Sequence, residues 1–244
     1  MTSPVDWMHV FVDVPTEVGA ETRAFWSGVS GWPVGSAVPG HPEFRSLDAQ
    51  EGSDYVHIQE VGGPPRVHVD LVVEDLDAGR MAMLELGAQP GPRHEHWQVM
   101  TSPHGQPFCL CREPGPTTRP PALRWPSGHR SRLVQVCLDV PDQVYDAELA
   151  FWQSATGWRP RSSVRRPEFT HLLPGPACPV QLLVQRLGPD DGATRAHLDL
   201  GTDDVAAEVD RLVALGAVHR HDGDGWVVLE DVAGLPFCVT RQPC

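Results

Sequence analysis

The sequence predicts an α+β fold: two tandem copies of one domain, each built from paired βαβββ modules that form an open curved sheet with helices outside. Three observations lead to this prediction. Long segments recur along the chain, apolar and polar residues alternate in the predicted strands, and residues between these strands show helical spacing. The recurrence indicates two domains, and the alternation indicates where a ligand would bind.

Matching segments establish the repeat. HVFVDVP (9–15) matches QVCLDVP (135–141), AFWSGVSGW (24–32) matches AFWQSATGW (150–158), and GQPFCL (105–110) matches GLPFCV (234–239). A repeat of this length indicates two copies of one domain. We expect the first domain over residues 1–116, a proline-rich linker over residues 117–131, and the second domain over residues 132–244.

Local patterns predict the elements of the first copy in order. Residues 8–14 alternate as a strand does, and Pro15 precedes a helix over residues 17–29 that ends at Gly31. Three strands are expected near residues 34–37, 43–48 and 54–61. The second half predicts a strand over 66–73, a helix over 75–87, and strands near 97–101 and 107–112, so it is shorter than the first half.

Alternation predicts two unlike faces of the sheet. One face carries Val10, Val12, Val14, Val56, Ile58, Val67, Val69, Leu71, Phe108 and Leu110. The other carries His9, Phe11, Asp13, His57, Gln59, His68, Asp70, Cys109 and Cys111. Because successive strand residues point to opposite faces, helices are expected to cover the apolar face. The polar face is then expected to form a concave binding cleft.

Composition excludes several classes of function. The net charge is −13, and all 19 basic residues are arginine. A chain without lysine has no amine for a Schiff base or a Walker-type phosphate loop. The acidic balance argues against nucleic acid as a partner, because phosphate binding needs a basic face. A small-molecule ligand is therefore the expected partner.

The sequence also predicts the cellular setting. No run of 18 apolar residues is present, and the N-terminus lacks the pattern of a secretion signal, so we expect no membrane association. Six cysteines occur without a paired C-x-x-C spacing, which indicates reduced thiols rather than a disulfide framework. These features predict a cytoplasmic protein, either a monomer or a homodimer.

Aspartates and tryptophans recur at matching positions of the two copies. The aspartates are Asp13 with Asp139 and Asp70 with Asp199, and the tryptophans are Trp26 with Trp152 and Trp32 with Trp158. Such aspartates act as general bases in some enzymes, but pairing with arginine or ending a strand is the more common role. The tryptophans lie at helix and turn positions that favour packing in the core.

Taken together, the AFW...GW opening, the VHVDLVVEDLDA segment (67–78), the LGA helix end and the closing SPHGQPFCL (102–110) resemble the glyoxalase, bleomycin-resistance and extradiol-dioxygenase superfamily, also called vicinal oxygen chelate proteins. More narrowly, they resemble tandem glyoxalase-like proteins of actinobacterial type. The resemblance covers both copies and leaves out only the linker. It implies a cleft that holds one divalent metal ion, with zinc, iron, manganese and nickel as candidates.

The resemblance implies metal ligands in the first domain. First-strand ligands of the two modules fall on His9 and His68, and a third falls near His57, with Gln59 as the alternative. The final-strand position falls on Cys109, where metal-using relatives often carry glutamate. Glu113 lies on the same predicted face as Cys109 and is a further candidate. Three side chains and an open position would let a substrate chelate the ion.

The second domain departs from this pattern. Gln135 replaces the first histidine, His197 remains, and Cys238 occupies the last position, so we expect this copy to be free of metal. Residues expected to line the ligand clefts are Phe11, Gln59, Trp97, Gln135, His197 and Trp226.

Three functions stay open at this point. The first is a metal-dependent isomerase, lyase or dioxygenase that acts on a small oxygenated molecule in the first domain. The second is a metal-free protein that binds a drug or metabolite, as resistance proteins of the superfamily do. The third is a scaffold whose clefts have lost their function, with the repeated histidines hydrogen-bonded within the sheet.

Overall fold

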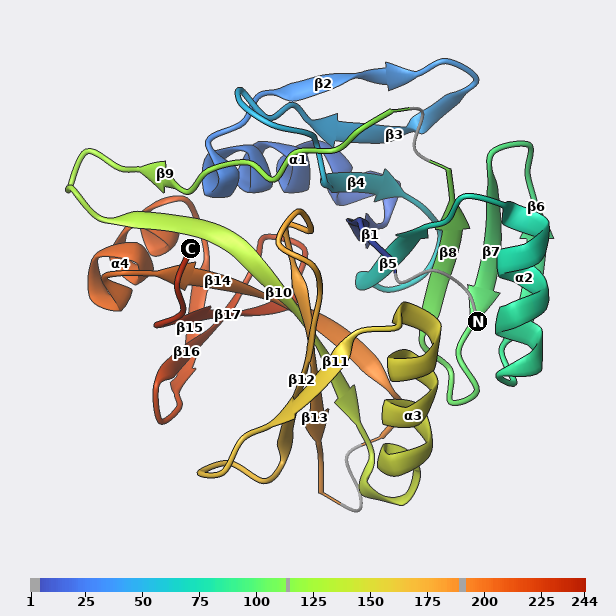
Figure 1. Cartoon of the computed structure of the whole chain (residues 1–244). Helices are drawn as coiled ribbons and strands as arrows, with labels where there is room; N and C mark the ends of the chain where they lie inside the picture. The colour runs from blue at the N-terminus through green and yellow to red at the C-terminus, as the bar shows by residue number, and fades with distance from the viewer. Residues whose placement is uncertain (1–4, 113–114, 189–191) are drawn as a thin grey trace. The chain divides into compact units, whose positions relative to one another are not determined.

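The computed structural model describes residues 5–112, 115–188 and 192–244, and it confirms an α+β fold (Figure 1). The described residues form two open mixed sheets and four α-helices. Each sheet is built from one copy of the repeat, as the sequence predicts. No helix in these ranges is both long enough and apolar enough to span a membrane.

The first copy supplies the 8-stranded sheet. Its elements are β1 (Met8–Val14), α1 (Thr16–Ser30), β2 (Val34–Val38), β3 (His41–Leu47), β4 (Val56–Glu60), β5 (Arg66–Val72), α2 (Leu76–Glu85), β6 (Gln89–Arg93), β7 (Trp97–Thr101) and β8 (Pro107–Cys111). The strand order is β2-β3-β4-β1-β5-β8-β7-β6. The shortened second half was a wrong prediction, because β6 completes that module. Its five residues are all exposed and include two prolines, so it carries no alternating pattern.

The second copy supplies the 9-stranded sheet. Its elements are β9 (Leu123–Arg124), β10 (Arg130–Val140), the 3₁₀ turn Asp142–Val144, α3 (Tyr145–Thr156), β11 (Arg159–Ser162), β12 (Phe169–Leu173), β13 (Gln181–Arg186), β14 (Arg195–Thr202), α4 (Val205–Ala214), β15 (Val218–Asp222), β16 (Trp226–Glu230) and β17 (Pro236–Thr240). The strand order β11-β12-β13-β10-β14-β17-β16-β15 repeats that of the first sheet, and β9 pairs with β10. The two copies therefore share one topology.

Helix ends follow the sequence signals. Helix α1 ends at Gly31, whose φ of 70° lies in the left-handed region and whose N–H donates to the carbonyl of Ser27. Helix α3 ends in the same way at Gly157, with a φ of 68°. Glycine adopts this conformation at little cost because it has no Cβ. The second helix of each copy instead begins with an aspartate cap, Asp75 or Asp204.

The chain divides into two compact units that each combine both copies. The first unit contains the described residues 5–10, 68–112, 115–118, 136–188 and 192–196. The second unit contains residues 11–67, 119–135 and 197–244. Each unit therefore takes one βαβββ module, in large part, from each copy of the repeat.

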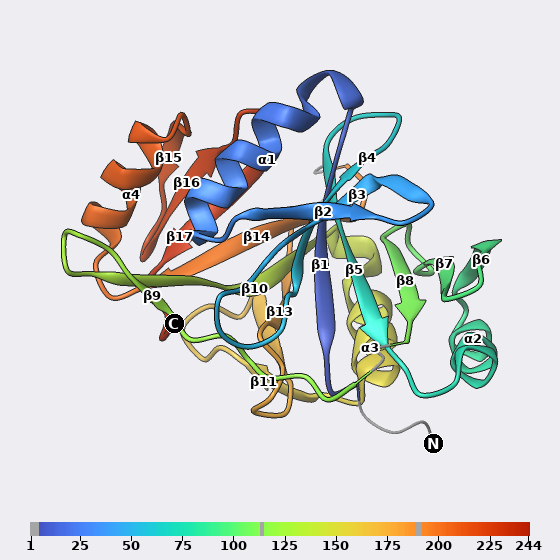
Figure 2. The same ribbon diagram turned by 90° about the horizontal axis from the view of Figure 1, so that it is seen from above.

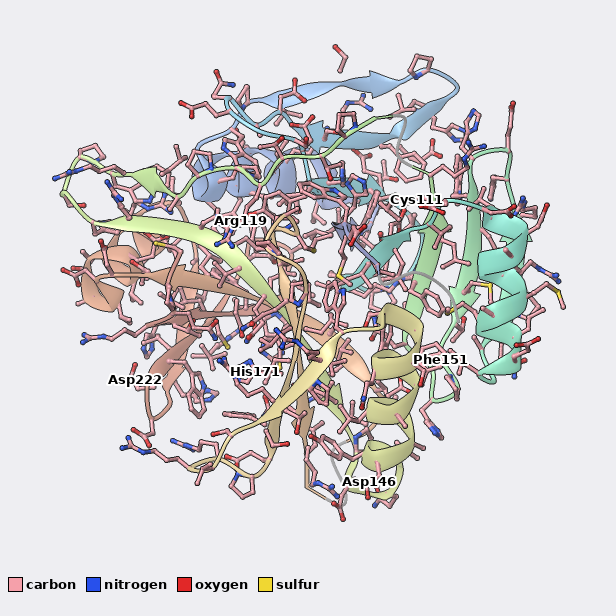
Figure 3. The ribbon with its side chains drawn as sticks, viewed as in Figure 1. Cys111, Arg119, Asp146, Phe151, His171 and Asp222 are labelled. Atoms are coloured by element: carbon pink, nitrogen blue, oxygen red, sulfur yellow. The ribbon has the colours of Figure 1, made fainter. Side chains whose placement is uncertain are left out.

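Aromatic packing holds the first unit together. Phe108 on β8 contacts Phe151 and Trp152 on α3, with ring centroids 5.8 and 5.4 Å apart. Figure 3 labels Phe151 on this helix. The indole N–H of Trp152 donates to Glu148 over 2.8 Å inside this core. A strand of the first copy thus buries its apolar face against a helix of the second copy.

The second unit contains the matching arrangement. Phe25 and Trp26 on α1 contact Phe237 on β17, with centroids 6.0 and 5.5 Å apart. The indole N–H of Trp26 donates to Asp231 Oδ2 over 2.9 Å. Figure 2 shows α1 beside β17, in agreement with these ring contacts. Trp26, Trp32, Trp152 and Trp158 are all nearly fully buried, which confirms their predicted place in the core.

The predicted linker region includes a short β-hairpin. Its strands β9 and β10 pair Leu123 with Ser131 and Arg124 with Arg130. A turn closes the hairpin, because the N–H of Gly128 donates to the carbonyl of Trp125. Side chains of this hairpin bond to α4 within the second unit, as His129 does to Glu208 over 2.7 Å. Residues 119–135 are thus an integral part of the second unit.

Candidate functional site

Strand pairing brings three polar side chains together in the first unit. Strands β5 and β8 run parallel, and their register places Asp70 opposite Cys109. His68 lies two residues before Asp70, so both side chains point to the same face of the sheet. We call this set, His68, Asp70 and Cys109, the first His-Asp-Cys group. It lies on the face that the sequence predicts to be polar.

The geometry of the first His-Asp-Cys group is compact. His68 Nε2 lies 3.3 Å from Asp70 Oδ1, and one ligand atom from each of the three residues falls within 4.8 Å of the others. The residues are buried, with exposed fractions of 6%, 7% and 8%. Asp70 Oδ1 is buried and makes no hydrogen bond. A buried carboxylate oxygen without a donor is costly, because it has given up its hydration without replacement.

Burial keeps the thiol of Cys109 protonated. Desolvation raises the pKa of Cys109 to about 11, and the negative charge of Asp70 raises it further, while a hydrogen bond from His68 acts in the opposite direction. Because a thiolate is the reactive and metal-binding form of cysteine, Cys109 is inert near neutral pH unless a cation displaces its proton. This agrees with its sequence-based interpretation as an unreactive thiol.

Alkylation is expected to reflect this protonation. At pH 7.5, iodoacetamide should label Cys109 at least about ten-fold more slowly than the half-exposed Cys111, because only about one Cys109 in several thousand is thiolate at that pH. Labelling should then rise roughly ten-fold per pH unit until about pH 11. Mass spectrometry of the two sites after timed labelling measures both rates. Equal rates at pH 7.5 would show that Cys109 is ionised.

His9 lies in the same unit but outside the compact group. It is half-buried on β1, the strand next to β5, and its ring lies 6.2 Å from that of Trp7. The equivalent residue of the second copy is Gln135, whose amide Nε2 donates to Asp199. Since Asp199 is equivalent to Asp70, this bond indicates that a first-strand side chain can reach the carboxylate. His9 itself lies on β1, the strand that neighbours β5 with Asp70.

His57 belongs to a different environment in the second unit. Its ring stacks on Phe11 with centroids 4.7 Å apart, and its Nδ1 lies 3.0 Å from Ser46 Oγ. Phe44, which lies opposite Gln59 in the β3–β4 pairing, packs edge-on against Phe11 at 5.9 Å. Among the described residues, His57 joins no group of metal-ligating side chains. The structure thus gives Phe11 and His57 a shared aromatic contact.

Trp97, a predicted ligand-binding residue, lies on the same face of the sheet as the first His-Asp-Cys group. Trp97 begins β7, lies opposite Cys111 on β8, and stacks on His94 with centroids 4.3 Å apart. It therefore shares a face with Cys109, whose partner on β7 is Val99. Glu113 lies outside the residues that the structure describes.

The second unit contains an equivalent of the first group. His197 Nε2 lies 3.4 Å from Asp199 Oδ1, and Cys238 lies opposite Asp199 in the β14–β17 pairing. We call these three residues the second His-Asp-Cys group, and their ligand atoms also fall within 4.8 Å of one another. Gln135 donates to Asp199 Oδ2 and accepts from Gln242 at 3.3 Å. Here an amide holds the carboxylate where the first copy carries His9.

Trp226 occupies the position in the second copy that Trp97 has in the first. It begins β16, opposite Thr240 on β17, and two residues before Val228, which lies opposite Cys238. The indole packs directly on Gly223, where any side chain would overlap the ring. Trp226 therefore shares the face of the second His-Asp-Cys group.

Sequence reasoning missed the roles of Asp70 and Asp199. Arginine pairing holds for the other two aspartates, since Arg66 Nε donates to Asp13 at 2.9 Å and Arg195 lies 3.4 Å from Asp139. Asp70 and Asp199 instead face histidines. The signal that could have identified them is the His-x-Asp spacing that recurs in both copies alongside a final-strand cysteine.

The family model for a glyoxalase-like domain matches residues 9–111 and, a second time, residues 135–240. The chain belongs to the glyoxalase-like domain family. Both copies of this glyoxalase-like protein are covered, each from its first strand to its last. A comparison with curated protein sequences gives no match. Membership in the vicinal oxygen chelate superfamily, predicted from the motifs, is thereby confirmed.

Solved structures share the fold of this glyoxalase-like protein. A halotolerant catechol dioxygenase is similar with a TM-score of 0.62 and 17% identity over 97% of this chain and 87% of that one. A variant of homoprotocatechuate 2,3-dioxygenase from Brevibacterium fuscum is similar with a TM-score of 0.66 and 14% identity, over 99% of this chain and 72% of that one. A fusion of a xylose isomerase-like TIM barrel with 4-hydroxyphenylpyruvate dioxygenase is similar with a TM-score of 0.66 and 13% identity. The match includes 100% of this chain but only 50% of the length of that protein. At these identities the likeness shows the fold alone.

Proposed function

We propose that this glyoxalase-like protein binds a small oxygenated molecule at the first His-Asp-Cys group, over a divalent cation held by His68, Asp70 and Cys109 with His9 close by. The observation that carries the proposal is the buried Asp70 Oδ1 without a hydrogen-bond donor. A cation would compensate this oxygen directly. The proposal assigns binding and, for a suitable substrate, isomerase, lyase or dioxygenase chemistry to the first copy.

The donor set fits a divalent transition-metal ion. Imidazole, carboxylate and thiolate together are typical ligands of zinc, while imidazole with carboxylate also suits iron, manganese and nickel. The raised pKa of Cys109 does not oppose this fit, because a metal ion lowers the pKa of a coordinating thiol strongly. Cys109 would therefore lose its proton on metal binding, and affinity would rise with pH.

Each residue has a defined task in this proposal. Asp70 supplies the buried negative charge, and His68, 3.3 Å from it, is oriented by that carboxylate. Trp97 lies on the same face of the sheet and would contact the apolar part of the ligand. A bound divalent ion would act as a Lewis acid that polarises adjacent oxygens of the ligand.

The two copies differ at the first-strand position next to the carboxylate, and this difference supports a metal site in the first copy alone. Gln135 donates an amide hydrogen to Asp199 Oδ2, which satisfies that oxygen without a metal, while Asp199 Oδ1, like Asp70 Oδ1, is buried and makes no hydrogen bond. His9 at the same position of the first copy offers an imidazole instead. We therefore assign the cation to the first copy and metal-free binding to the second.

A metal-free function is the second candidate, and one observation favours it. The neutral thiol of Cys109 can donate a hydrogen bond toward Asp70, and the tautomer of His68 with a proton on Nε2 can do the same. In that case the group would bind the hydroxyl or carbonyl groups of a metabolite directly. Metal analysis separates the two candidates.

Calorimetric titration of the untagged full chain with zinc or manganese tests the proposal. One ion per chain is expected to bind the wild type, with affinity rising between pH 6 and 8. Asp70→Asn is expected to weaken binding at least about 100-fold, because it removes the anionic ligand while keeping the shape of the side chain. The matched control, Asp199→Asn in the second copy, should bind the ion as the wild type does.

Two outcomes would contradict the metal assignment. One is the absence of stoichiometric binding in the wild type for every divalent ion tested, including iron and nickel. The other is equal loss of affinity in Asp70→Asn and Asp199→Asn, which would place the ion elsewhere or show a general effect on folding.

A further inference from the structure

The turn of the β9–β10 hairpin carries an exposed serine. Residues Trp125 to Gly128 form this turn, in which the N–H of Gly128 donates to the carbonyl of Trp125. Pro126 fixes the backbone at the second position, and Gly128 has a φ of 95°, a value that favours glycine. Ser127 lies between them and is exposed. A Cβ added to Gly128 would meet no heavy atom beyond its chain neighbours within 4 Å, so the tip of the turn is open.

The hydroxyl of Ser127 contacts a buried histidine. Ser127 Oγ lies 2.6 Å from His129 Nδ1, and the other ring nitrogen, Nε2, lies 2.7 Å from Glu208 Oε2. His129 and Glu208 are both buried, with exposed fractions of 5% and 0%. The hydroxyl, the imidazole and the carboxylate thus form a continuous chain of hydrogen bonds from the surface into the second unit.

Glu208 determines which nitrogen of His129 carries the proton. The carboxylate accepts two bonds from Arg211 and one from Ser131, so it is the acceptor in each of these bonds. We therefore take it to accept from His129 as well, which places the proton of the neutral ring on Nε2. Nδ1 is then an acceptor, and Ser127 donates its hydroxyl hydrogen to it. His129 is thus oriented to take the proton of this hydroxyl.

This arrangement has the parts of an activated nucleophile. A hydroxyl, a base within hydrogen-bond reach and a third group that orients the base define a Ser-His-acid site, whatever the fold or the order along the chain. The two ring nitrogens exchange their usual roles here, because Nδ1 faces the hydroxyl. The exchange follows from the sequence, since Ser127 is only two residues from His129 and Nδ1 is the ring nitrogen closer to the backbone.

Two arginines flank the turn in a chain whose net charge is −13. The β9–β10 register places Arg124 directly opposite Arg130, on either side of Ser127 in the sequence. Positive charge near the hydroxyl would stabilise the negative charge that develops on an ester oxygen during acyl transfer. Both arginines are exposed, so salt would screen this contribution.

We propose that Ser127 is a nucleophile that accepts the acyl group of small activated esters, with His129 as its general base. Ser127 Oγ forms a bond to the carbonyl carbon of the ester while His129 Nδ1 takes the hydroxyl proton. The bond from that carbon to the leaving oxygen then breaks, and the proton passes from Nδ1 to the departing alcohol. The products are acyl-Ser127 and the free alcohol, and the step needs no other reactant. Because Ser127, His129 and Glu208 all belong to the second unit, this proposal does not depend on the cation site at Asp70.

Timed reaction of the full chain with para-nitrophenyl acetate tests this inference, with nitrophenolate release and peptide mass spectrometry as the readouts. Wild type is expected to acetylate Ser127 at least about ten-fold faster than any other serine, because a positioned general base accelerates the attack. The chain has no lysine, so side-chain amines do not compete for the acetyl group. Ser127→Ala should remove the acetylated site. The matched control Ser154→Ala, which replaces an exposed serine on α3, should leave acetylation of Ser127 unchanged.

The role of His129 is tested separately. His129→Gln keeps an amide N–H for Glu208 but has no basic nitrogen, so acetylation of Ser127 should fall at least about ten-fold. Circular dichroism checks that the variant is folded. If it is not folded, wild-type acetylation in heavy water takes its place, and it should be slower than in water because a proton moves as Oγ attacks. Three results would each overturn the inference: no acetyl group on Ser127 in wild type, equal acetylation in the folded His129→Gln variant, or equal rates in the two solvents.

Discussion

Replacing Glu208 with alanine is expected to lower the free energy of unfolding by about 3–5 kcal/mol, the usual cost of removing one partner of a buried ion pair. Glu208 is fully buried on α4. It accepts two bonds from Arg211, at 2.8 and 2.7 Å, and contacts His129 Nε2 at 2.7 Å. Ser131 donates to the same carboxylate.

The loss is large because two partners of Glu208, His129 and Ser131, stay buried without it. His129 is 5% exposed, and the guanidinium of Arg211 lies 3.5 Å above the ring of Trp125. Alanine would leave the buried imidazole of His129 and the buried hydroxyl of Ser131 without this acceptor, and Arg211 would keep only its bonds to the carbonyls of Gly28 and Val29. Each polar group left without its acceptor carries a desolvation cost. Helix α4 and the β9–β10 hairpin would then lose their common attachment.

Denaturant unfolding at several urea concentrations measures this change. Glu208→Gln should fall between wild type and Glu208→Ala, because the amide keeps one acceptor oxygen. Asp210→Ala, an exposed carboxylate on the same helix, is the matched control and should change stability by less than about 0.5 kcal/mol. A Glu208→Ala protein within about 1 kcal/mol of wild type would contradict this account of the buried network.

Separating the two copies is expected to abolish folding of each. Residues 1–116 alone would expose Phe108, Phe25 and Trp26, whose partners Phe151, Trp152 and Phe237 lie in the other copy. Each buried aromatic side chain contributes about 1.5–3 kcal/mol. Three exposed rings therefore remove roughly 5–9 kcal/mol, which is comparable with the whole stability of a domain, about 5–15 kcal/mol.

Fragments 1–116 and 117–244 expressed separately provide the test. Each alone should show no cooperative thermal transition, and mixing them should restore one, because the units combine modules of both copies. The intact chain is the control. Cooperative unfolding of either fragment as a monomer would show that the copies are independent folding units.

The fold was predictable because its signals are local or repeated. Alternation placed Val10, Val12 and Val14 on a buried face, and glycine marked the ends of α1 and α3. Strand β6 was not predictable, since its exposed proline-containing residues show no pattern. The packing of helix α3 against β8 was also not predictable. The two copies have equivalent apolar faces, so the sequence does not show whether a helix covers the sheet of its own copy or that of the other copy.

The candidate site was predictable only in part. His68 and Cys109 were predicted as metal ligands, whereas Asp70 was interpreted as pairing with arginine or ending a strand, and the structure places it against His68 instead. The proposed role of Asp70 depends on the β5–β8 register, which places Asp70 opposite Cys109. The pattern of residues along one strand does not show how that strand is aligned with its neighbour. His57 shows the same limit, because its stacking on Phe11 follows from strand pairing rather than from spacing.

The position of a bound ion decides whether a cation lies at Asp70. Crystals of the full chain grown with manganese and measured for anomalous scattering would show the position of the ion. We predict one strong peak within about 2.0–2.3 Å of Asp70 Oδ1 and a nitrogen of His68. A manganese-loaded crystal with its peak elsewhere, or with no peak at the first His-Asp-Cys group, would contradict the account.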